Sequence, residues 1–228
     1  MSVLAPDLAA RLGVGPAAAL PAPATTGGGA AEGILPVPPP LAALLPAGGL
    51  RRGSVVQVER SGALALALLG RASAEGAWCA LVGLPTVGLL AAAELGLDLD
   101  RLALVPDPGP DWPSVVAAFV DALDIIVLAP PTPLAPARTR RLAARVRERG
   151  AVLVVHGRWE GSEVRLAAVA ARCHGIGAGH GRLTGYTLQV ESRGRGAAAR
   201  PRRAALQIGD QPYRDTPPVV LPAGPRAA

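Results

Sequence analysis

Lysine and asparagine are both absent from the 228 residues, so all 23 strongly basic side chains are arginines. Alanine, glycine, proline and arginine are abundant instead, which is the bias that a GC-rich genome imposes on any protein. The net charge of +6 would otherwise suggest nucleic-acid binding. Because of this bias, only the clustering of the arginines counts as evidence for such binding.

Aromatic residues make up only 3% of the chain, and it has two cysteines, Cys79 and Cys173. Half of the residues are hydrophobic, so the core must be packed from Ala, Val and Leu rather than from rings. Both cysteines lie in apolar segments, as is typical of buried free thiols in a reducing compartment. No apolar run reaches the roughly 18 residues of a membrane span, and the N-terminus does not resemble a secretion signal. These absences predict a soluble cytoplasmic protein with no membrane partner.

Composition divides the chain into three parts. Residues 1–40 are rich in Ala, Pro and Gly, which is typical of a low-complexity tail or linker, with a short helix expected at most near Asp7–Leu12. Residues 41–210 carry the periodic pattern of one folded domain. Residues 211–228 are Pro-rich and lack periodicity, which predicts a disordered tail.

Apolar β-like runs alternate with helical segments in the middle of the chain. Nearly continuous Val, Ile and Leu runs predict strands covered on both faces, at Val55–Val58, Trp78–Val82, Leu102–Val105, Asp124–Leu128 and Ala151–Val155. The intervening segments predict helices at Ala63–Ala74, Thr86–Leu95, Trp112–Ala122 and Pro136–Arg149. This alternation predicts an α/β fold with a mainly parallel sheet. After Gly157, three β-like segments joined by Gly- and Arg-rich turns predict antiparallel strands that extend the sheet.

The order of these segments resembles that of the RecA-type core. LAALLPAGGLRRGSVVQV, residues 41–58, is similar to the Gly-Gly-Leu-x-x-Gly turn that precedes the nucleotide-site strand of that family. AEGAWCALVG, AAAELGLDLDRLALVPDPG and LDIIVLAPP then follow in the order and spacing of its next three strands. Residues 166–208 resemble its closing strands. The resemblance implies a RecA-like three-layer core with C-terminal antiparallel strands.

The phosphate loop of such a core departs from its pattern here. A G-x-x-x-x-G-K-[ST] loop holds phosphates with backbone N–H groups, a lysine and a magnesium-binding hydroxyl. A shorter loop without lysine stands in its place, made of Glu59, Arg60, Ser61, Gly62 and Ala63. Pro85 takes the position of the family's water-activating Glu, and Ala129 that of its magnesium-organising Asp. We therefore expect no ATP hydrolysis and no bound cofactor.

A RecA-like core without an ATP site resembles the ImuA-type accessory proteins of the bacterial mutasome. RRLAARVRERGAVLVV and GRLTGYTLQVESRGRG are similar to the actinobacterial branch of that family. The resemblance implies a non-catalytic, nucleoid-associated adaptor in SOS-type, error-prone translesion synthesis. Its implied partners are an ImuB-type polymerase homologue, RecA or a second copy of itself, and DNA. Two alternatives stay open: a SulA-like inhibitor of cell division, and a nucleotide-binding protein with a non-standard phosphate loop.

The best candidates for DNA contact are clustered arginines at and after the YTLQVE segment: Arg193, Arg195, Arg200, Arg202 and Arg203. Such a cluster can neutralise several phosphates. The alternative is a solvated hairpin in an arginine-biased protein. Residues 157–164 take the place of the second DNA-binding loop of RecA and offer Arg158 and Trp159. We expect Trp159 to be a lid on the sheet edge rather than a partner anchor.

Two further groups of residues suggest no chemistry. Cys173 and His174 are adjacent on a predicted strand and point to opposite faces, so with His180 and His156 they form at best an incomplete metal site. The arginines of helix 136–149 surround a single apolar stripe, which is typical of a solvated surface helix. Glu148 is the only acidic residue among them, so a partner-facing role for this helix stays open. The sequence thus predicts no metal and no catalytic residue.

Overall fold

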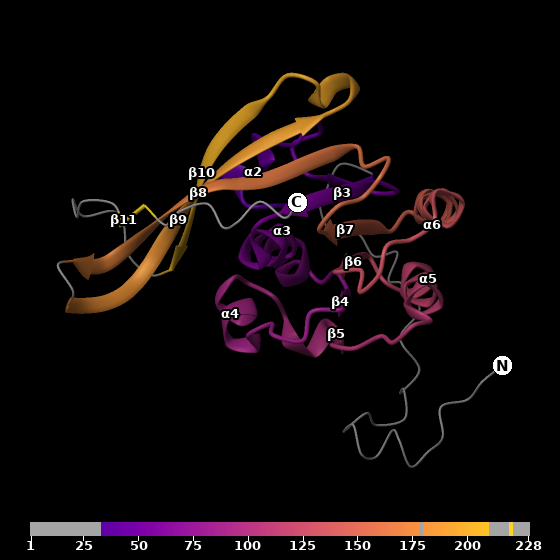
Figure 1. The fold of residues 1–228 in the computed structure, drawn as a ribbon, viewed down its shortest axis with the longest axis horizontal. Coiled ribbons are helices and arrows are strands. Elements are labelled where there is room, and N and C mark those ends of the chain that lie inside the picture. Colours follow the sequence, from indigo (N-terminus) through magenta and orange to yellow (C-terminus); the bar gives the residue numbers. More distant parts are fainter. Residues whose placement is uncertain (1–32, 178–179, 210–218, 221–228) are drawn as a thin grey trace, which may run out of the picture.

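A computed structural model describes residues 33–177, 180–209 and 219–220 (Figure 1). Within that part of the chain, one sheet of nine strands has the order β10-β9-β8-β3-β7-β6-β4-β5, and β11 pairs separately with β8. Its strands are β3 (Val55–Glu59), β4 (Cys79–Val82), β5 (Leu102–Val105), β6 (Ile125–Leu128), β7 (Val152–His156), β8 (Val164–Gly177), β9 (His180–Gly194), β10 (Arg202–Gly209) and β11 (Val219–Val220).

Helices join the strands, and a small hairpin precedes them. The helices are α2 (Pro39–Ala42), α3 (Gly62–Ala74), α4 (Leu89–Glu94), α5 (Trp112–Ala122) and α6 (Pro136–Arg149), with single 3-10 turns at η1 (Leu99–Arg101) and η2 (Gly196–Ala198). β1 (Ile34–Leu35) pairs with β2 (Leu50–Arg51). Strands β3 to β7 are parallel, β8 starts parallel to β3, and β9 to β11 are antiparallel to their neighbours. The predicted α/β fold with a mainly parallel sheet and antiparallel C-terminal strands is confirmed.

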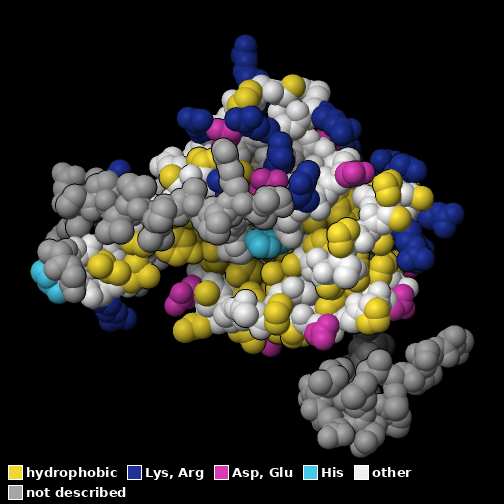
Figure 2. Space-filling model, in the orientation of Figure 1, with side chains coloured by type: hydrophobic (Ala, Val, Ile, Leu, Met, Phe, Trp, Pro, Cys, Tyr) yellow, Lys and Arg dark blue, Asp and Glu magenta, His cyan; other side chains and the backbone are white. Residues whose placement is uncertain are grey.

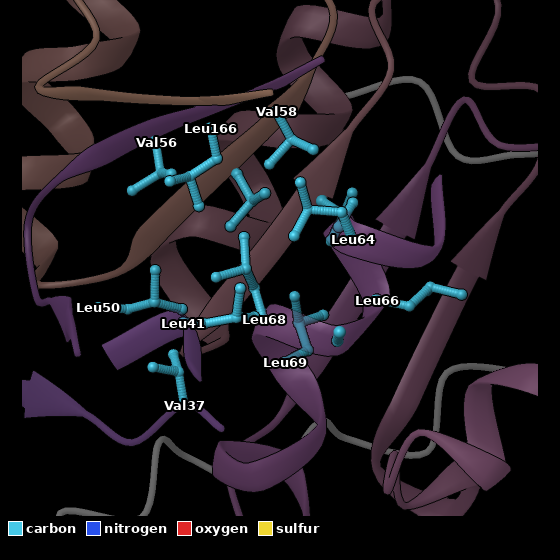
Figure 3. Packing of buried hydrophobic residues seen from close by; sticks show 14 of the residues in the cluster. Val37, Leu41, Leu50, Val56, Val58, Leu64, Leu66, Leu68, Leu69 and Leu166 are labelled. Carbon is cyan, nitrogen blue, oxygen red and sulfur yellow. The ribbon is translucent and has the colours of Figure 1, made fainter. Parts of the chain in front are cut away.

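The sheet is covered by helices on both faces, because its parallel strands alternate apolar side chains between two cores. Val56 and Val58 point toward α2, α3 and α4, whereas Val55 points toward α5 and α6. Figure 3 shows Val56, Val58 and Leu166 gathered with Leu64 and Leu68 in the first of these cores. Leu and Val dominate both cores, as the scarcity of aromatic residues requires.

Helix α3 packs closely against the end of α4 through a glycine. A Cβ at Gly70 would lie 1.8 Å from the carbonyl oxygen of Leu95, so only glycine fits at that position. The helix is otherwise rich in Leu and Ala, which favour helix formation. Gly70 is therefore retained for packing, at a cost in helix propensity.

Some element boundaries differ from the prediction. The helix expected from Thr86 begins at Leu89, because Gly88 precedes it in an extended conformation (ψ 115°). Leu35 and Val37 are buried in the core, so packed structure begins before residue 41. Val219–Val220, inside the predicted C-terminal tail, pairs with β8 at Cys173 and Arg172. The helix expected near residues 7–12 lies outside the described residues.

No helix among the described residues is long and apolar enough to cross a membrane.

Candidate functional site

The predicted nucleotide loop lies at the carboxyl end of β3, near the middle of the sheet between β7 and β8. This is where ligands bind in open parallel sheets. Only Arg60 and Ser61 separate the end of β3 from the first residue of α3. A loop of this length has no room to wrap around a phosphate.

Ser61 closes the N-terminus of α3 with its own atoms. Its Oγ accepts a hydrogen bond from the N–H of Leu64 at 3.1 Å, and its carbonyl accepts one from the N–H of Ala65 at 3.4 Å. Phosphate groups bind at helix N-termini by taking such free N–H groups. In this helix the hydroxyl of the Ser61 N-cap already takes one of them, that of Leu64, whereas the bond from Ala65 is the ordinary first backbone bond of the helix.

Arg60 has a left-handed backbone with φ of 67°, and no other non-glycine residue does so in the part of the chain that the structure describes. That conformation is strained for a residue with a Cβ. It turns the chain sharply from the strand into the helix. The side chain of Arg60 is exposed, outside the tight turn.

Glu59 is held by neighbours on the sheet face that points away from α3. The Nε2 of Gln57 donates to its Oε1 at 2.7 Å, and the Nη1 of Arg165 lies 3.5 Å from the same oxygen. Ser162 in turn donates to the Oε1 of Gln57 at 3.3 Å. The carboxylate thus belongs to a polar network at the end of β3, on the sheet face opposite α3.

The loops after β4 and β6, which lie beyond β7 in the sheet, bring no acidic group to the same edge. Pro85 is exposed after β4, and Ala129 follows β6 directly, where its N–H donates to the carbonyl of Val82 at 2.9 Å. A Cβ at Gly83 would lie 2.1 Å from the carbonyl oxygen of Ala129. Backbone packing therefore fills the space between these loops, and neither segment, 83–88 or 129–135, contains a carboxylate.

The arginine cluster lies at the opposite end of the strands, level with the amino end of β3. There the end of β9 pairs with the start of β8, and β10 pairs with β9 (Val164 opposite Gly194, Arg203 opposite Glu191). Figure 2 shows basic side chains gathered with acidic ones over this region, at the top of the view. Arg158 is not part of this group, because it follows the carboxyl end of β7.

Three of the five clustered arginines are already engaged. Arg193 is paired with Glu191, and the Nη2 of Arg203 lies 2.8 Å from the same carboxylate. These arginines hold the pKa of the Glu191 carboxyl below its usual range. Arg202 donates to the carbonyl of Ala43 at 3.2 Å. Arg195 and Arg200 are exposed, and their side chains have no ion pair within the described segments.

Trp159 is a core residue. It is 9% exposed and packs in the cluster under α5 and α6, so it is not an exposed anchor, and it covers interior strands rather than the sheet edge. Its Nε1 is the one buried side-chain nitrogen or oxygen without a hydrogen-bond partner among residues 33–177, 180–209 and 219–220. The segment that contains it crosses β3, since the N–H of Glu163 donates to the carbonyl of Val55 at 3.0 Å.

Comparison with known proteins shows the family to which the chain belongs. The family model of the MT3502 N-terminal domain matches residues 43–161, which is more than half of the chain. The chain belongs to this family. It is similar to the uncharacterized protein Rv3395c of Mycobacterium tuberculosis (strain ATCC 25618 / H37Rv), with 39% identity over 163 residues. The match covers 67% of this chain and 80% of that protein.

The region matched by the MT3502 N-terminal domain runs through the parallel strands β3 to β7 and ends in the loop that contains Trp159. It therefore includes the closed loop after β3 and the helix pair α5 and α6. The arginines at the end of β9 and on β10 lie outside it. The family model thus covers the parallel half of the sheet with its helices.

The histidines and cysteines of this MT3502-family chain are dispersed. No group of three or more His, Cys, Asp or Glu side chains suited to a metal occurs among the described residues. Burial lowers the pKa of His156, which ends β7 beside Val58. His174 hydrogen-bonds to the Oγ1 of Thr187 at 2.7 Å. Burial raises the pKa of the Cys79 thiol to about 12, so this thiol is inert.

Sequence reasoning missed a groove between α5 and α6. Its volume is about 320 Å³, and it is lined by Asp111, Pro113, Ser114, Ala117, Leu134, Arg138, Arg141, Leu142 and Arg145. The available signal was the spacing of arginines 138, 141 and 145 along one side of a helix. The sequence does not show that this side of α6 faces α5 across a hollow.

Proposed function

We propose that this protein is a non-catalytic adaptor with a RecA-like core, which acts by binding other proteins in damage-induced, error-prone translesion synthesis. The observation that carries the proposal is the closed loop between β3 and α3, where Ser61 caps the helix in place of a phosphate. A polymerase homologue of the ImuB type is its first proposed partner. RecA, a second copy and DNA at the nucleoid are the others.

The sheet supports the RecA-like part of the proposal. β3 is the strand expected to carry the nucleotide loop, and it lies inside the sheet between β7 and β8. The strands expected to close the core, β8 to β10, extend the sheet beyond β3 in antiparallel order. The order of these strands along the chain thus supports the resemblance that the sequence suggested.

The loss of ATP chemistry is supported by three independent features. The loop after β3 is too short to surround a phosphate, Ser61 caps the N–H of Leu64, and the loop contains no lysine. The loops after β4 and β6 supply no carboxylate for a metal or a water. Restoring ATP binding would require changes in all of these elements.

Calorimetric titration of the folded full chain with ATP and magnesium tests the absence of nucleotide chemistry. We expect no binding heat, with circular dichroism as the control for folding. Saturable micromolar binding would overturn the proposal and favour a non-standard phosphate site, to be sought first at Arg60.

Pull-down with purified partners tests the adaptor role. We expect retention of the ImuB-type polymerase homologue and no retention of the tubulin-like septal GTPase. The reverse result would favour a SulA-like inhibitor of cell division. Retention of neither protein, at concentrations where both are folded, would overturn the adaptor proposal.

DNA contact is a second candidate activity, favoured by the exposure of Arg195 and Arg200 beside the β9–β10 turn. Replacing both by alanine should lower the slope of log affinity against log salt for duplex DNA by about 2, because two phosphate contacts are lost. Arg193 and Arg203 should contribute less, since both are paired with Glu191. An unchanged slope in the double variant would exclude this surface.

A further inference from the structure

Helices α5 and α6 lie side by side, on the side of the molecule away from the projecting β8–β9 ribbon (Figure 1). The groove between them has an apolar lining from Pro113 and Ala117 of α5 and from Leu134 and Leu142 at α6. Leu142 is buried, whereas the other three are half-buried and reachable from outside. A ligand in this groove would therefore contact apolar side chains at its floor.

The hollow continues along the outer side of α6. A second depression of about 350 Å³ is lined by Ala144, Glu148 and Arg149 and shares Arg141 and Arg145 with the first. The row from Arg138 to Arg149 is about 17 Å long at the helical rise, or three turns. A rigid segment of similar length would fill the whole groove.

The rim of the groove is basic. Helix α6 carries six arginines, whereas α5 with its N-cap and α6 together carry only three carboxylates, Asp111, Asp121 and Glu148. Figure 2 shows this concentration of basic side chains at the right of the view, where α6 lies. An occupant of this groove should therefore be acidic.

The carboxylates at the rim do not cancel the arginines. Asp121 binds both Arg145 and Arg149, with the Nε of Arg145 2.8 Å and that of Arg149 3.1 Å from its Oδ1. Asp111 accepts from the hydroxyl of Ser114 at 2.8 Å. Arg138 and Arg141 are exposed at the mouth of the groove, and no ion pair involves them within the described residues.

We propose that the groove between α5 and α6 binds an acidic amphipathic helix of a partner protein. Apolar side chains of that helix would cover Ala117 and Leu134, and its flanking carboxylates would pair with Arg138 and Arg141. Recognition of a helix in an apolar groove uses residues at i, i+3, i+4 and i+7, and about three turns match the length available here. The inference goes beyond the proposed function, since it names a surface and a chemistry that hold for whichever protein carries the helix.

Nucleic acid fits this groove less well. A phosphate backbone would pair with the arginines, but it has no apolar groups to pack against the apolar lining of the groove. Single-stranded nucleic acid binds such surfaces by stacking bases on aromatic rings. No aromatic side chain lines the groove. The chemistry of the lining therefore favours a protein helix.

The test uses the full chain and a fluorescent synthetic peptide of about 16 residues, with Leu at i, i+3, i+4 and i+7 and Glu on both flanks. Fluorescence anisotropy should show saturable binding, which a scrambled peptide of the same composition lacks. The double variant Arg138→Glu/Arg141→Glu should weaken binding at least about tenfold, because it places like charges at the rim. Leu134→Ala should weaken it about threefold through the lining.

The matched control is Arg140→Glu/Arg147→Glu, which makes the same charge change on the same helix at exposed positions that do not line the groove. It should alter peptide affinity by less than about threefold, the effect of long-range charge alone. Equal losses in both double variants would overturn the proposal, as would equal binding of the scrambled peptide or no binding of the acidic one. Displacement of the peptide by duplex DNA that depends on Arg138 and Arg141 would instead assign the groove to nucleic acid and overturn it too.

Discussion

The two halves of the sheet differ in what covers them. Every residue of β4 and β6 is buried, and both faces of these strands lie under helices. In β8 and β9, buried residues alternate with half-buried and exposed ones, because α2 and α3 cover only one face. The parallel half is thus a scaffold, and the antiparallel half can present polar groups to solvent.

The uncovered face of the antiparallel half carries a ladder of polar and charged side chains. Gln57 lies opposite Arg165, Arg165 opposite Arg193, and Glu191 opposite Arg203 across three strand pairs. Most of these charges are neutralised by ion pairs along the sheet. Charge on this face therefore stabilises the ribbon more than it attracts a partner, in contrast to the basic rim of the α5–α6 groove.

The strongest test of the difference between the halves compares two truncations. Ile126→Ala in β6 removes a fully buried side chain and should lower the free energy of unfolding by about 2–5 kcal/mol. Val169→Ala lies at a register shift in β8, where the side chain is 41% exposed, and should cost less than about 0.5 kcal/mol. Urea unfolding followed by circular dichroism measures both. Equal losses would show that the ribbon is packed as tightly as the parallel half.

A smaller but sharper effect is expected for Gly70→Ala in α3. Alanine gains about 1 kcal/mol of helix propensity, but its Cβ meets the backbone of Leu95, and the clash should leave a net loss of about 1–3 kcal/mol. Gly62→Ala in the same helix is the control, because no atom lies within 4 Å of its Cβ. It should be neutral or slightly stabilising. Stabilisation by Gly70→Ala would contradict the close approach of α3 and α4.

The contrast between the halves also explains what the sequence could predict. Fully buried strands are uninterrupted apolar runs, so the strands at Cys79–Val82 and Ile125–Leu128 were located within one residue. Helices with strong boundary signals, such as Pro113 at the start of α5 and Gly150 (φ 69°) at the end of α6, were located to the residue. Boundaries with weak signals were predicted wrongly, as at the start of α4, which follows Gly88.

The site was less predictable, because it depends on which residues meet across the sheet. Loss of the lysine and shortening of the loop were visible in sequence, but the cap that Ser61 makes on α3 is a matter of geometry. The pairing of Arg193 and Arg203 with one carboxylate depends on the register of β9 and β10. The groove depends on the packing of α5 against α6, which no local pattern specifies.

Replacement of Ser61 tests the closed loop. Ser61→Ala should lower the free energy of unfolding by about 1 kcal/mol, because the N–H of Leu64 loses its acceptor. Ser61→Asp should recover most of that loss, since aspartate is an equally good cap and favours the positive end of the helix. Urea midpoints of the three proteins give the comparison. A loss in Ser61→Asp equal to that in Ser61→Ala would show that Ser61 does something other than cap α3.

The smallest effect is expected at the charged face of the ribbon, and it depends on pH. The side chain of Glu191 is 7% exposed and lies between Arg193 and Arg203, which lower its pKa in the folded chain. A carboxylate with a lowered pKa contributes stability above its unfolded value, about 4.3, and that contribution is lost as the pH falls through the folded value.

Glu191→Gln should therefore lower the urea midpoint at pH 7 by a constant amount down to about pH 5, and the difference from the parent should shrink on further acidification. Glu160→Gln, which changes an exposed carboxylate without an ion pair among the described residues, should leave the midpoint unchanged across the range. A difference that grows toward acid would mean that Glu191 is destabilised in its charged form. In that case the ladder on the uncovered face would oppose the fold, and the ribbon would be held by its apolar face alone.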